Sequence, residues 1–222
     1  MHFDFETMSH QDCYRLLVNS VVPRPIAFVT SVDHDGTLNA APFSFFNVMG
    51  HDPPVVVVGI ERKAGGAAGA LKDTAANIRS THEFVINLVS EEMVEAMSTC
   101  AADFSADVDE LDKAGLAPLA STKVAPLRIA LSPASFECRE MMSIGIGDGR
   151  TLVVGTVVAM HLQDRFYDES TRRISTPEMR LVGRMHGKGW YARTSDLFFV
   201  PRGTVSDATG EPSSDPSPNE PI

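Results

Sequence analysis

The stretch that most limits the possible folds runs from Arg24 to Ile60, where short apolar runs alternate with turn-forming residues. Pro25 to Val32 is rich in Ile, Phe, Val and Thr, which strands favour. Asp33 to Gly36 then supplies Asp and Gly for a tight turn, and Thr37 to Ala41 returns as a second strand. The stretch therefore predicts an antiparallel hairpin.

A loop of mixed chemistry follows this hairpin at Pro42 to Asn47, which breaks the alternation of a strand. It offers backbone groups, a hydroxyl, an amide and phenylalanine rings close together, which would suit a flat ligand ring with polar edges. The same phenylalanines would equally suit a hairpin corner that packs into the core. Spacing alone leaves both interpretations open.

The rest of the chain contains several more short strand patterns and a few short helical ones. Pro54 to Ile60 is almost continuously apolar, as in a strand that is buried on both faces or lies inside a barrel. Further strands are predicted at 83–89, 127–131, 134–144 and 151–163, a final strand pair at 189–193 and 197–200, and helices near 10–18, 75–80, 90–100 and 109–114. No repeated βαβ unit is visible. The sequence therefore predicts a mainly β fold, an antiparallel barrel with short peripheral helices.

Length and composition indicate one domain. With 222 residues and 43% hydrophobic content, the chain can bury a single sizeable core, which we assign to residues 1–202. Residues 203–222 are rich in Pro, Ser and Gly and contain acidic residues but no Lys or Arg. We expect this segment to be a disordered acidic tail.

Several classes of protein are disfavoured. The net charge of -10 argues against a nucleic-acid surface, and no apolar run approaches the roughly 20 residues of a membrane helix. Cys13, Cys100 and Cys138 are widely spaced, and the histidines lack metal-ligand spacing, so no disulfide framework and no metal site are predicted. The N-terminus lacks the pattern of a signal peptide. These observations favour a cytoplasmic protein.

Positive charge and helix-start residues gather after the hairpin, at Arg62, Lys72 and Thr74. A helix N-terminus favours an anion, so this region could bind a phosphate. An ordinary N-cap with solvated lysines is the alternative, because the Asp73 carboxylate could cap the same N–H groups. Combined with Thr30, Ser31 and the 42–47 loop, the pattern predicts a ligand with one anionic end and one flat ring.

Three ordered blocks of the sequence carry a family resemblance. They are RPIAFVTSVDHDGTLNAAPFSFFNVMGHDPPVVVVGI, KDTAANIRSTHEFVINLV and GRMHGKGWYAR. Together they resemble the flavin reductase-like family of FMN-binding split barrels, from about Val18 to Arg202. The resemblance implies a six-stranded Greek-key split barrel, normally a homodimer that binds FMN near the subunit interface.

The resemblance also implies roles for residues in the three blocks. The first two blocks would hold FMN. The phosphate or ribityl chain would lie near Thr30, Ser31, Asn39, Lys72 and Thr74, with further polar or charged contacts from Asn77, Asn87 and Arg62. The isoalloxazine would lie along Pro42, Phe43, Ser44, Phe45 and Phe46. The third block would close over the flavin from the same or the partner subunit, through His186, Trp190, Tyr191 and Arg193. His186 is the candidate catalytic residue. Core or interface packing for Trp190 and Tyr191, and a plain surface cation for Arg193, are the alternatives.

The activity implied by the resemblance is that of an FMN-dependent oxidoreductase. NADH or NADPH would pass a hydride to the flavin, and a small-molecule acceptor or a partner oxygenase would take the electrons. A flavin-dependent oxygenase acting on a small organic substrate and a non-enzymatic electron carrier are alternatives. The choice of FAD in place of FMN stays open.

Overall fold

The structure is a computed structural model that describes residues 1–62, 70–102, 104, 108–147 and 149–200. The predicted tail at 203–222 lies outside the described residues. One antiparallel sheet dominates the fold, with its strands in the order β2-β1-β5-β8-β9-β4-β3. The strands are β1 (Ala27–Val32), β2 (Leu38–Phe43), β3 (Phe46–His51), β4 (Pro54–Glu61), β5 (Glu83–Leu88), β8 (Ala134–Ile146) and β9 (Arg150–Leu162).

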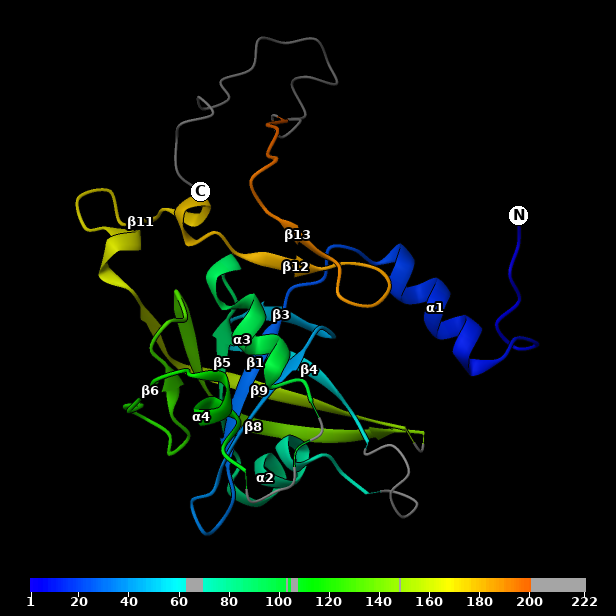
Figure 1. Cartoon of the computed structure of the whole chain (residues 1–222), viewed down its shortest axis with the longest axis horizontal. Coiled ribbons are helices and arrows are strands. Elements are labelled where there is room, and N and C mark those ends of the chain that lie inside the picture. The colour runs from blue at the N-terminus through cyan, green and yellow to red at the C-terminus, as the bar shows by residue number, and fades with distance from the viewer. Residues whose placement is uncertain (63–69, 103, 105–107, 148, 201–222) are drawn as a thin grey trace.

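The two outer strands of this order are consecutive in the chain. Only Ser44 and Phe45 separate β2 from β3, and the backbone N–H of Gly59 on β4 donates to the carbonyl of Phe45 over 2.7 Å. The sheet therefore curls into a barrel (Figure 1). When β2 and β3 are counted as one bent strand, the six strands and the split-barrel architecture expected from the resemblance are confirmed.

Short helices and two-stranded ribbons surround the barrel. The helices are α1 (His10–Ser20), α2 (Asp73–Thr81), α3 (Val94–Thr99) and α4 (Glu110–Ala114), with 3-10 turns η1 (Glu91–Met93), η2 (Asp164–Phe166) and η3 (Thr176–Met179). The ribbons pair β6 (Pro118–Leu119) with β7 (Arg128–Ile129), β10 (Tyr167–Asp168) with β11 (Arg173–Ile174), and β12 (Val182–Arg184) with β13 (Tyr191–Arg193). Within the described ranges, no helix has the length and apolarity needed to cross a membrane.

Two apolar clusters hold these elements together. Inside the barrel, Val29, Phe46 and Phe84 pack with Ile78 of α2, which closes one end. On the other face of β1, Phe28 packs with residues of η1, α3 and α4. The helices α3 and α4 therefore lie outside the barrel, next to the edge formed by β1 and β2.

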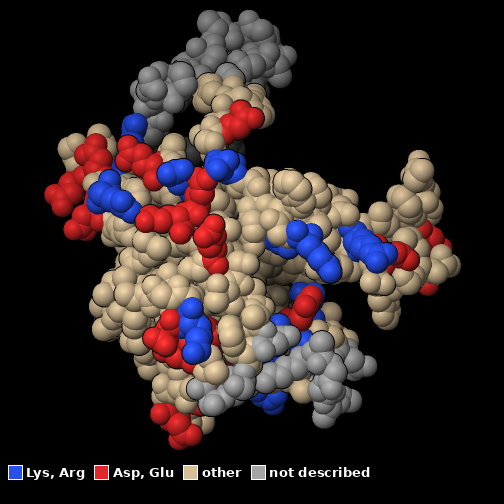
Figure 2. All heavy atoms as spheres, viewed as in Figure 1, with Lys and Arg blue, Asp and Glu red and all other residues tan. Residues whose placement is uncertain are grey.

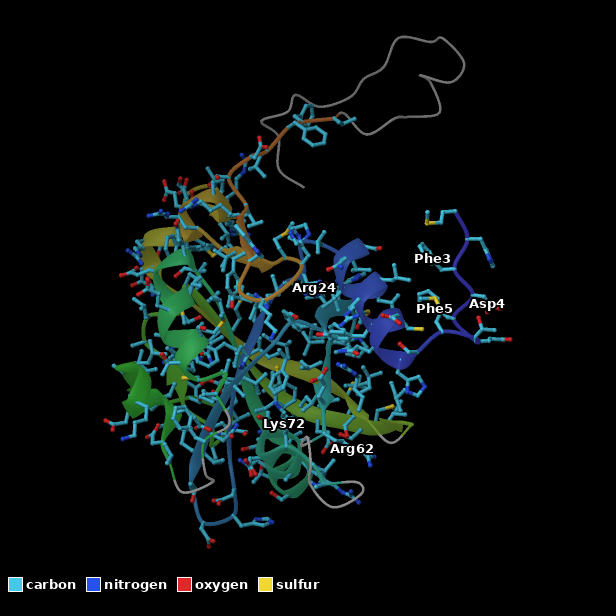
Figure 3. The ribbon with its side chains drawn as sticks, turned by 45° about the vertical axis from the view of Figure 1, so that its right-hand side comes forward. Phe3, Asp4, Phe5, Arg24, Arg62 and Lys72 are labelled. Carbon is cyan, nitrogen blue, oxygen red and sulfur yellow. The ribbon has the colours of Figure 1, made fainter. Side chains whose placement is uncertain are left out.

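The N-terminal segment projects away from the barrel. Figures 1 and 3 show that α1 lies beside the barrel, and Figure 3 shows Phe3 and Phe5 on the N-terminal segment that precedes this helix. Both phenylalanines are exposed, as are Tyr14 and Leu17 on the helix. Ser9 begins α1 as expected, because its hydroxyl accepts a hydrogen bond from the backbone N–H of Asp12.

The charged side chains are intermixed on the surface. Figure 2 shows acidic and basic groups next to one another at the upper left of the face that it draws. Ion pairs account for part of this mixing, since Glu91 binds both Arg180 and Arg193, and Glu61 binds Arg150. Acids and bases are therefore neighbours at several places on the surface.

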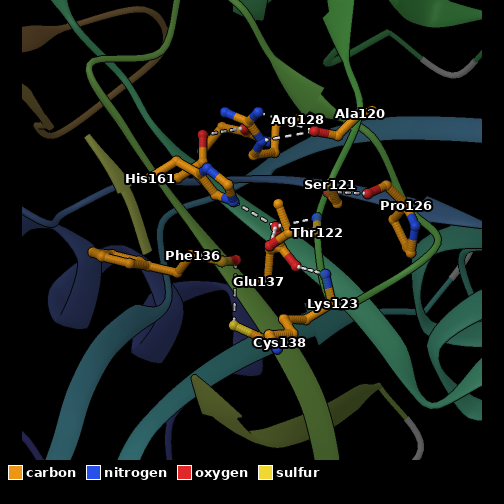
Figure 4. A network of polar contacts seen from close by, with 12 residues as sticks. Ala120, Ser121, Thr122, Lys123, Pro126, Arg128, Phe136, Glu137, Cys138 and His161 are labelled. Carbon is orange, nitrogen blue, oxygen red and sulfur yellow. Dashed lines mark hydrogen bonds and ion pairs between the residues drawn. The ribbon is translucent and has the colours of Figure 1, made fainter. Parts of the chain in front are cut away.

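A buried carboxylate joins the segment before β7 to β8 (Figure 4). Glu137 is fully buried and accepts hydrogen bonds from the backbone N–H groups of Thr122 and Lys123, and its Oε1 lies 2.5 Å from Nε2 of His161. Burial alone would raise the pKa of Glu137, but these contacts outweigh it and lower the pKa to about 2. The carboxylate therefore stays charged and fixes the path of the 121–126 segment.

Two expectations about local structure are wrong. The 42–47 loop is not a loop throughout, because β2 extends to Phe43 and β3 begins at Phe46, each held by ladder bonds to a neighbour. Tyr191 to Arg193 pairs with Val182 to Arg184, while 197–200 forms no strand. Pairing with a neighbouring strand decided both cases, and the residue types of a short segment do not specify its pairing partner.

Candidate functional site

A groove runs along β2. Its main cavity, of about 250 Å³, lies between β2, the start of α2 and the segment that connects α3 to α4. It adjoins a cavity of about 170 Å³ through Pro42, Phe43 and Ala101, and another of about 90 Å³ through Asn39, Asp73 and Glu110. We call these three cavities together the β2 groove.

The α2 end of the groove combines a helix N-terminus with polar side chains. Thr74 is buried, and its hydroxyl lies 2.8 Å from the side-chain amide of Asn39 on β2. Lys72 precedes the helix and supplies no side-chain cap to it. Because the first N–H groups of a helix have no partner within it, this end favours a negatively charged ligand group.

Glu110 brings a carboxylate into the same end of the groove, which the sequence analysis did not foresee. Its Oε2 accepts a hydrogen bond of 3.1 Å from the backbone N–H of Ala40. Burial raises the pKa of Glu110 above its ordinary value, and the nearby Asp109 and Asp73 carboxylates add to the rise. A short helix with no recognisable motif places this residue, so no sequence signal marked it.

The middle of the groove is a slot between apolar walls. Pro42 and Phe43 form the β2 side, while Ala101, Ala102 and Phe104 line the slot from the connection between α3 and α4. Cys100 also lines it, and burial raises the pKa of this thiol to about 12, so it stays protonated. A flat aromatic ring would suit this slot, because apolar residues line it from both β2 and the connection between α3 and α4.

The opposite end of the groove is lined by Ser44, Arg184 and Tyr191. The Arg184 guanidinium lies 5.0 Å from the centre of the Tyr191 ring, within the range of a cation–π contact. Of the residues predicted from the third sequence block, Tyr191 thus reaches the groove. Arg184 was not anticipated, although it belongs to the same block.

Several predicted polar residues lie in the barrel wall and not on the groove. The Thr30 hydroxyl donates to the carbonyl of Leu127, and Ser31 accepts from the Asn77 amide over 3.3 Å. Thr30 and Ser31 are fully buried, as is Asn87, which bonds to the Phe28 carbonyl. Of these residues, Asn77 alone lines part of the groove.

Phe45, Phe46 and Arg62 also point elsewhere. Phe45 and Phe46 line a separate cavity beside α1, and the Phe45 ring packs under the guanidinium of Arg150 at 4.2 Å. Arg62 forms a backbone bridge with Leu71, just before Lys72, and its buried Nε has no hydrogen-bond partner among the described residues. Figure 3 shows Arg62 and Lys72 at the same end of the barrel.

The remaining residues of the third block lie outside the groove lining. His186 and Trp190 are exposed and stack on each other with ring centres 6.4 Å apart. Arg193 binds Glu91 and lines a different cavity. The structure therefore brings together Asn39, Pro42, Phe43, Ser44, Lys72, Thr74 and Tyr191, with Asn77 at the far end.

The fold and the groove, taken with the sequence comparison, define a class. The protein is a split barrel with an aromatic slot beside a helix N-terminus, and its sequence matches an oxidoreductase domain. It is therefore a flavin-related oxidoreductase. The chain belongs to the flavin reductase-like family, since a sequence model of the flavin reductase like domain matches residues 19–175. An uncharacterized protein of Deinococcus radiodurans is 37% identical over 210 residues, spanning 92% of this chain and 91% of the relative.

Two solved structures are similar in both sequence and fold. The 2-nitrobenzoate 2-nitroreductase NbaA of Pseudomonas fluorescens is 33% identical, with a TM-score of 0.83, and the match covers 96% of this chain and 100% of that one. Component B of nitrilotriacetate monooxygenase from Bacillus cereus is 31% identical, also with a TM-score of 0.83, covering 90% and 98%. Both names describe oxidation–reduction enzymes, which agrees with the class.

Proposed function

We propose that the β2 groove binds FMN, with the phosphate at the start of α2 and the isoalloxazine along Pro42 and Phe43. The observation that carries this proposal is the groove itself, in which one continuous surface joins Lys72 and Thr74 to an aromatic slot. The groove fits FMN because the helix N-terminus and Lys72 supply donors for a phosphate, while Asn39 can bond to ribityl hydroxyls.

A carboxylate beyond the proposed phosphate position supports FMN over FAD. The small cavity at that end is lined by Asp33 together with Asp73 and Glu110, which also line the main cavity. Hydrogen bonding from the backbone N–H of Thr37 lowers the pKa of Asp33, so this carboxylate is charged at neutral pH. A second phosphate placed there would meet like charge, which disfavours a dinucleotide.

In this proposal NADH or NADPH is the electron donor, and bound FMN supplies the chemistry of accepting a hydride and passing electrons on. The chain would orient the flavin and exclude water from it. Phe43 and Phe104 would cover the isoalloxazine, and Thr74 and Lys72 would hold the phosphate end. The acceptor is a small molecule or a partner oxygenase. The names of the nitroreductase and the monooxygenase component support these two kinds of acceptor.

The test is anaerobic titration of FMN-loaded protein with NADH and, separately, with NADPH, followed by flavin absorbance. We expect bleaching of the oxidised flavin by at least one donor. Bleaching by neither donor would contradict the reductase activity and favour an electron carrier. Substrate-dependent incorporation of oxygen into an organic product would favour an oxygenase.

We also propose that the protein is a homodimer and acts in the cytoplasm. The outward face of β4, β9 and β8 is apolar, since Val57 pairs with Val154, which pairs with Met142, and Leu152 pairs with Ile144. Met142 and Ile144 are about half exposed, at 51% and 46%. An apolar sheet face of this kind is typical of an interface, and a second copy of the chain is the partner proposed here.

A further inference from the structure

Arg24 and Arg184 are held side by side at the end of the β2 groove opposite α2. The backbone N–H of Arg24 donates to the Arg184 carbonyl over 3.0 Å, and the reverse bond measures 2.8 Å. The two chain segments approach closely, because a Cβ at Gly183 would lie only 2.5 Å from Cβ of Pro23. This contact fixes the position of both arginines relative to the groove.

Arg184 is one of the residues that line the cavity to which Ser44 and Phe43 also contribute. The group donates to the carbonyls of Gly187, at 3.0 Å, and Trp190, at 3.3 Å, and lies over the Tyr191 ring. These partners are neutral. Among the described residues, no carboxylate forms an ion pair with Arg184.

Arg24 adds a second positive charge, and no carboxylate in the described part of the chain forms an ion pair with it. It is the sole buried arginine in the described part of the chain, with 7% of its surface exposed. Its guanidinium donates to the carbonyls of Val18, Val21 and Met185 and to the Ser44 hydroxyl. Figure 3 shows Arg24 near the C-terminal end of α1, well separated from Lys72 and Arg62 at the other end of the barrel.

Two guanidinium groups with neutral partners leave net positive charge at a pocket. A buried cation without a counter-ion is costly, and the cost falls when an anion occupies the neighbouring space. By contrast, Arg150, Arg180 and Arg193 each bind a glutamate, and Arg128 and Arg165, which donate to neutral groups, line none of the three cavities of the β2 groove. The Ser44–Arg184 pocket is therefore suited to an oxyanion.

We infer that the pocket lined by Arg184, Ser44 and Tyr191 binds the carboxylate or phosphate group of the molecule that exchanges electrons with the flavin. Arg184 is the direct contact, because its planar fork matches a carboxylate or phosphate in two-point hydrogen bonding. Arg24 acts through Ser44 as a positioning residue. The inference rests on the proposed function, since Phe43, shared with the main cavity, places the pocket next to the proposed ring position.

The test compares charged probes with neutral counterparts on FMN-loaded protein. Benzoate against benzamide represents an acceptor carboxylate, and ADP against adenosine represents the phosphates of a nicotinamide donor. Binding is measured by calorimetry and by perturbation of the flavin spectrum. We expect at least one charged probe to bind about tenfold more tightly than its neutral counterpart. The pair with the larger difference shows whether the pocket binds the carboxylate of an acceptor or the phosphates of a nicotinamide donor.

Variants assign the effect to Arg184. Arg184→Gln should remove the preference for the charged probe, while Arg184→Lys should retain part of it and so report on the pocket even where the glutamine variant is less stable. Arg165→Gln is the matched control, because Arg165 likewise lies over an aromatic ring, that of Phe166 at 4.6 Å, and should keep the full preference. Unchanged preference in both Arg184 variants, or no preference in the unaltered protein, would overturn the inference.

The result can be separated from the proposed function. Uptake of FMN is measured first, from the absorbance of the reconstituted protein. If no FMN is taken up, the proposed function fails, and the same calorimetric titrations on FMN-free protein still test the pocket. There, Arg165→Gln should preserve the charge preference and Arg184→Gln should not, because Arg165 lines none of the three cavities of the β2 groove.

Discussion

The side-chain amide of Asn39 and the hydroxyl of Thr74 are hydrogen-bonded over 2.8 Å, which ties the outer strand β2 to the first turn of α2. The contact joins residues far apart in the sequence and fixes the width of the β2 groove at the proposed phosphate position. Thr74 is buried, so its hydroxyl has little freedom to move. The site for the anionic end of a ligand is therefore preformed.

Lys72→Ala should weaken binding of FMN about tenfold to a hundredfold, because a charge-assisted contact to phosphate contributes about 1.5–3 kcal/mol. Riboflavin, which has no phosphate, should bind the variant and the unaltered protein equally. Fluorescence titration with both flavins measures the difference. Lys113→Ala removes an exposed lysine of α4 and serves as the control. Equal losses for FMN and riboflavin would argue against a phosphate contact.

Glu110→Gln should tighten binding of FMN at neutral pH. The carboxylate lies in the cavity that contains Lys72 and Thr74, and burial raises its pKa, so it becomes charged only at higher pH than an ordinary glutamate. As pH rises through that range, binding of FMN to the unaltered protein should weaken by repulsion. The amide oxygen of glutamine can still accept the bond from Ala40, so the fold is retained. A variant with the same pH dependence as the unaltered protein would refute this role.

Glu137→Gln should lower the free energy of unfolding by about 3 kcal/mol, because an amide cannot replace all the hydrogen bonds of a buried carboxylate. Glu83→Gln is the matched control: Glu83 accepts from the backbone N–H of Ala125 in the same segment, but its side chain is only partly buried. We expect a loss within about 1 kcal/mol there. Urea denaturation at pH 7 measures both.

The contribution of Glu137 should also depend on pH in a defined direction. Its pKa is lowered from an ordinary 4.5 to about 2, so the stabilisation is fully present above pH 4.5 and is lost as pH falls toward 2. The difference in stability between the unaltered protein and Glu137→Gln should shrink over that window. A difference that stays constant between pH 5 and about pH 2.5 would contradict the assigned pKa.

Met142→Glu should convert the proposed homodimer into a monomer, because it places a charge on the outward apolar face of β8. Analytical ultracentrifugation gives the mass directly. Ile174→Glu, at an exposed apolar residue of the separate β10–β11 ribbon, is the control and should leave the mass unchanged. A monomeric unaltered protein would refute the dimer, and a dimeric Met142→Glu would move the interface elsewhere.

Much of the barrel could be predicted from local patterns. The alternation in Glu83 to Leu88, the apolar run of β4 and the glycine-rich turn before β9 each mark an element that the structure contains. The bend at Ser44 and Phe45 could not be predicted, because it depends on the bond from Gly59 and on pairing with β4. Local residue types there permit either a loop or two strands.

The candidate site was only partly predictable for the same reason. Lys72, Thr74, Pro42 and Phe43 lie in short blocks with recognisable chemistry, and the fold brings them together. Thr30 has the same polar character, but its side chain lies on the same face of β1 as Phe28, outside the barrel, where its hydroxyl donates to the Leu127 carbonyl. Glu110 and Arg184 reach the groove only through tertiary packing.

The most direct test of the central claim is a crystal structure of the FMN-loaded protein. We predict that the FMN phosphate lies within hydrogen-bonding distance of Lys72 and Thr74 and that the isoalloxazine packs along Pro42 and Phe43. A flavin bound outside the β2 groove, or bound there with its phosphate beside Arg184, would contradict this account.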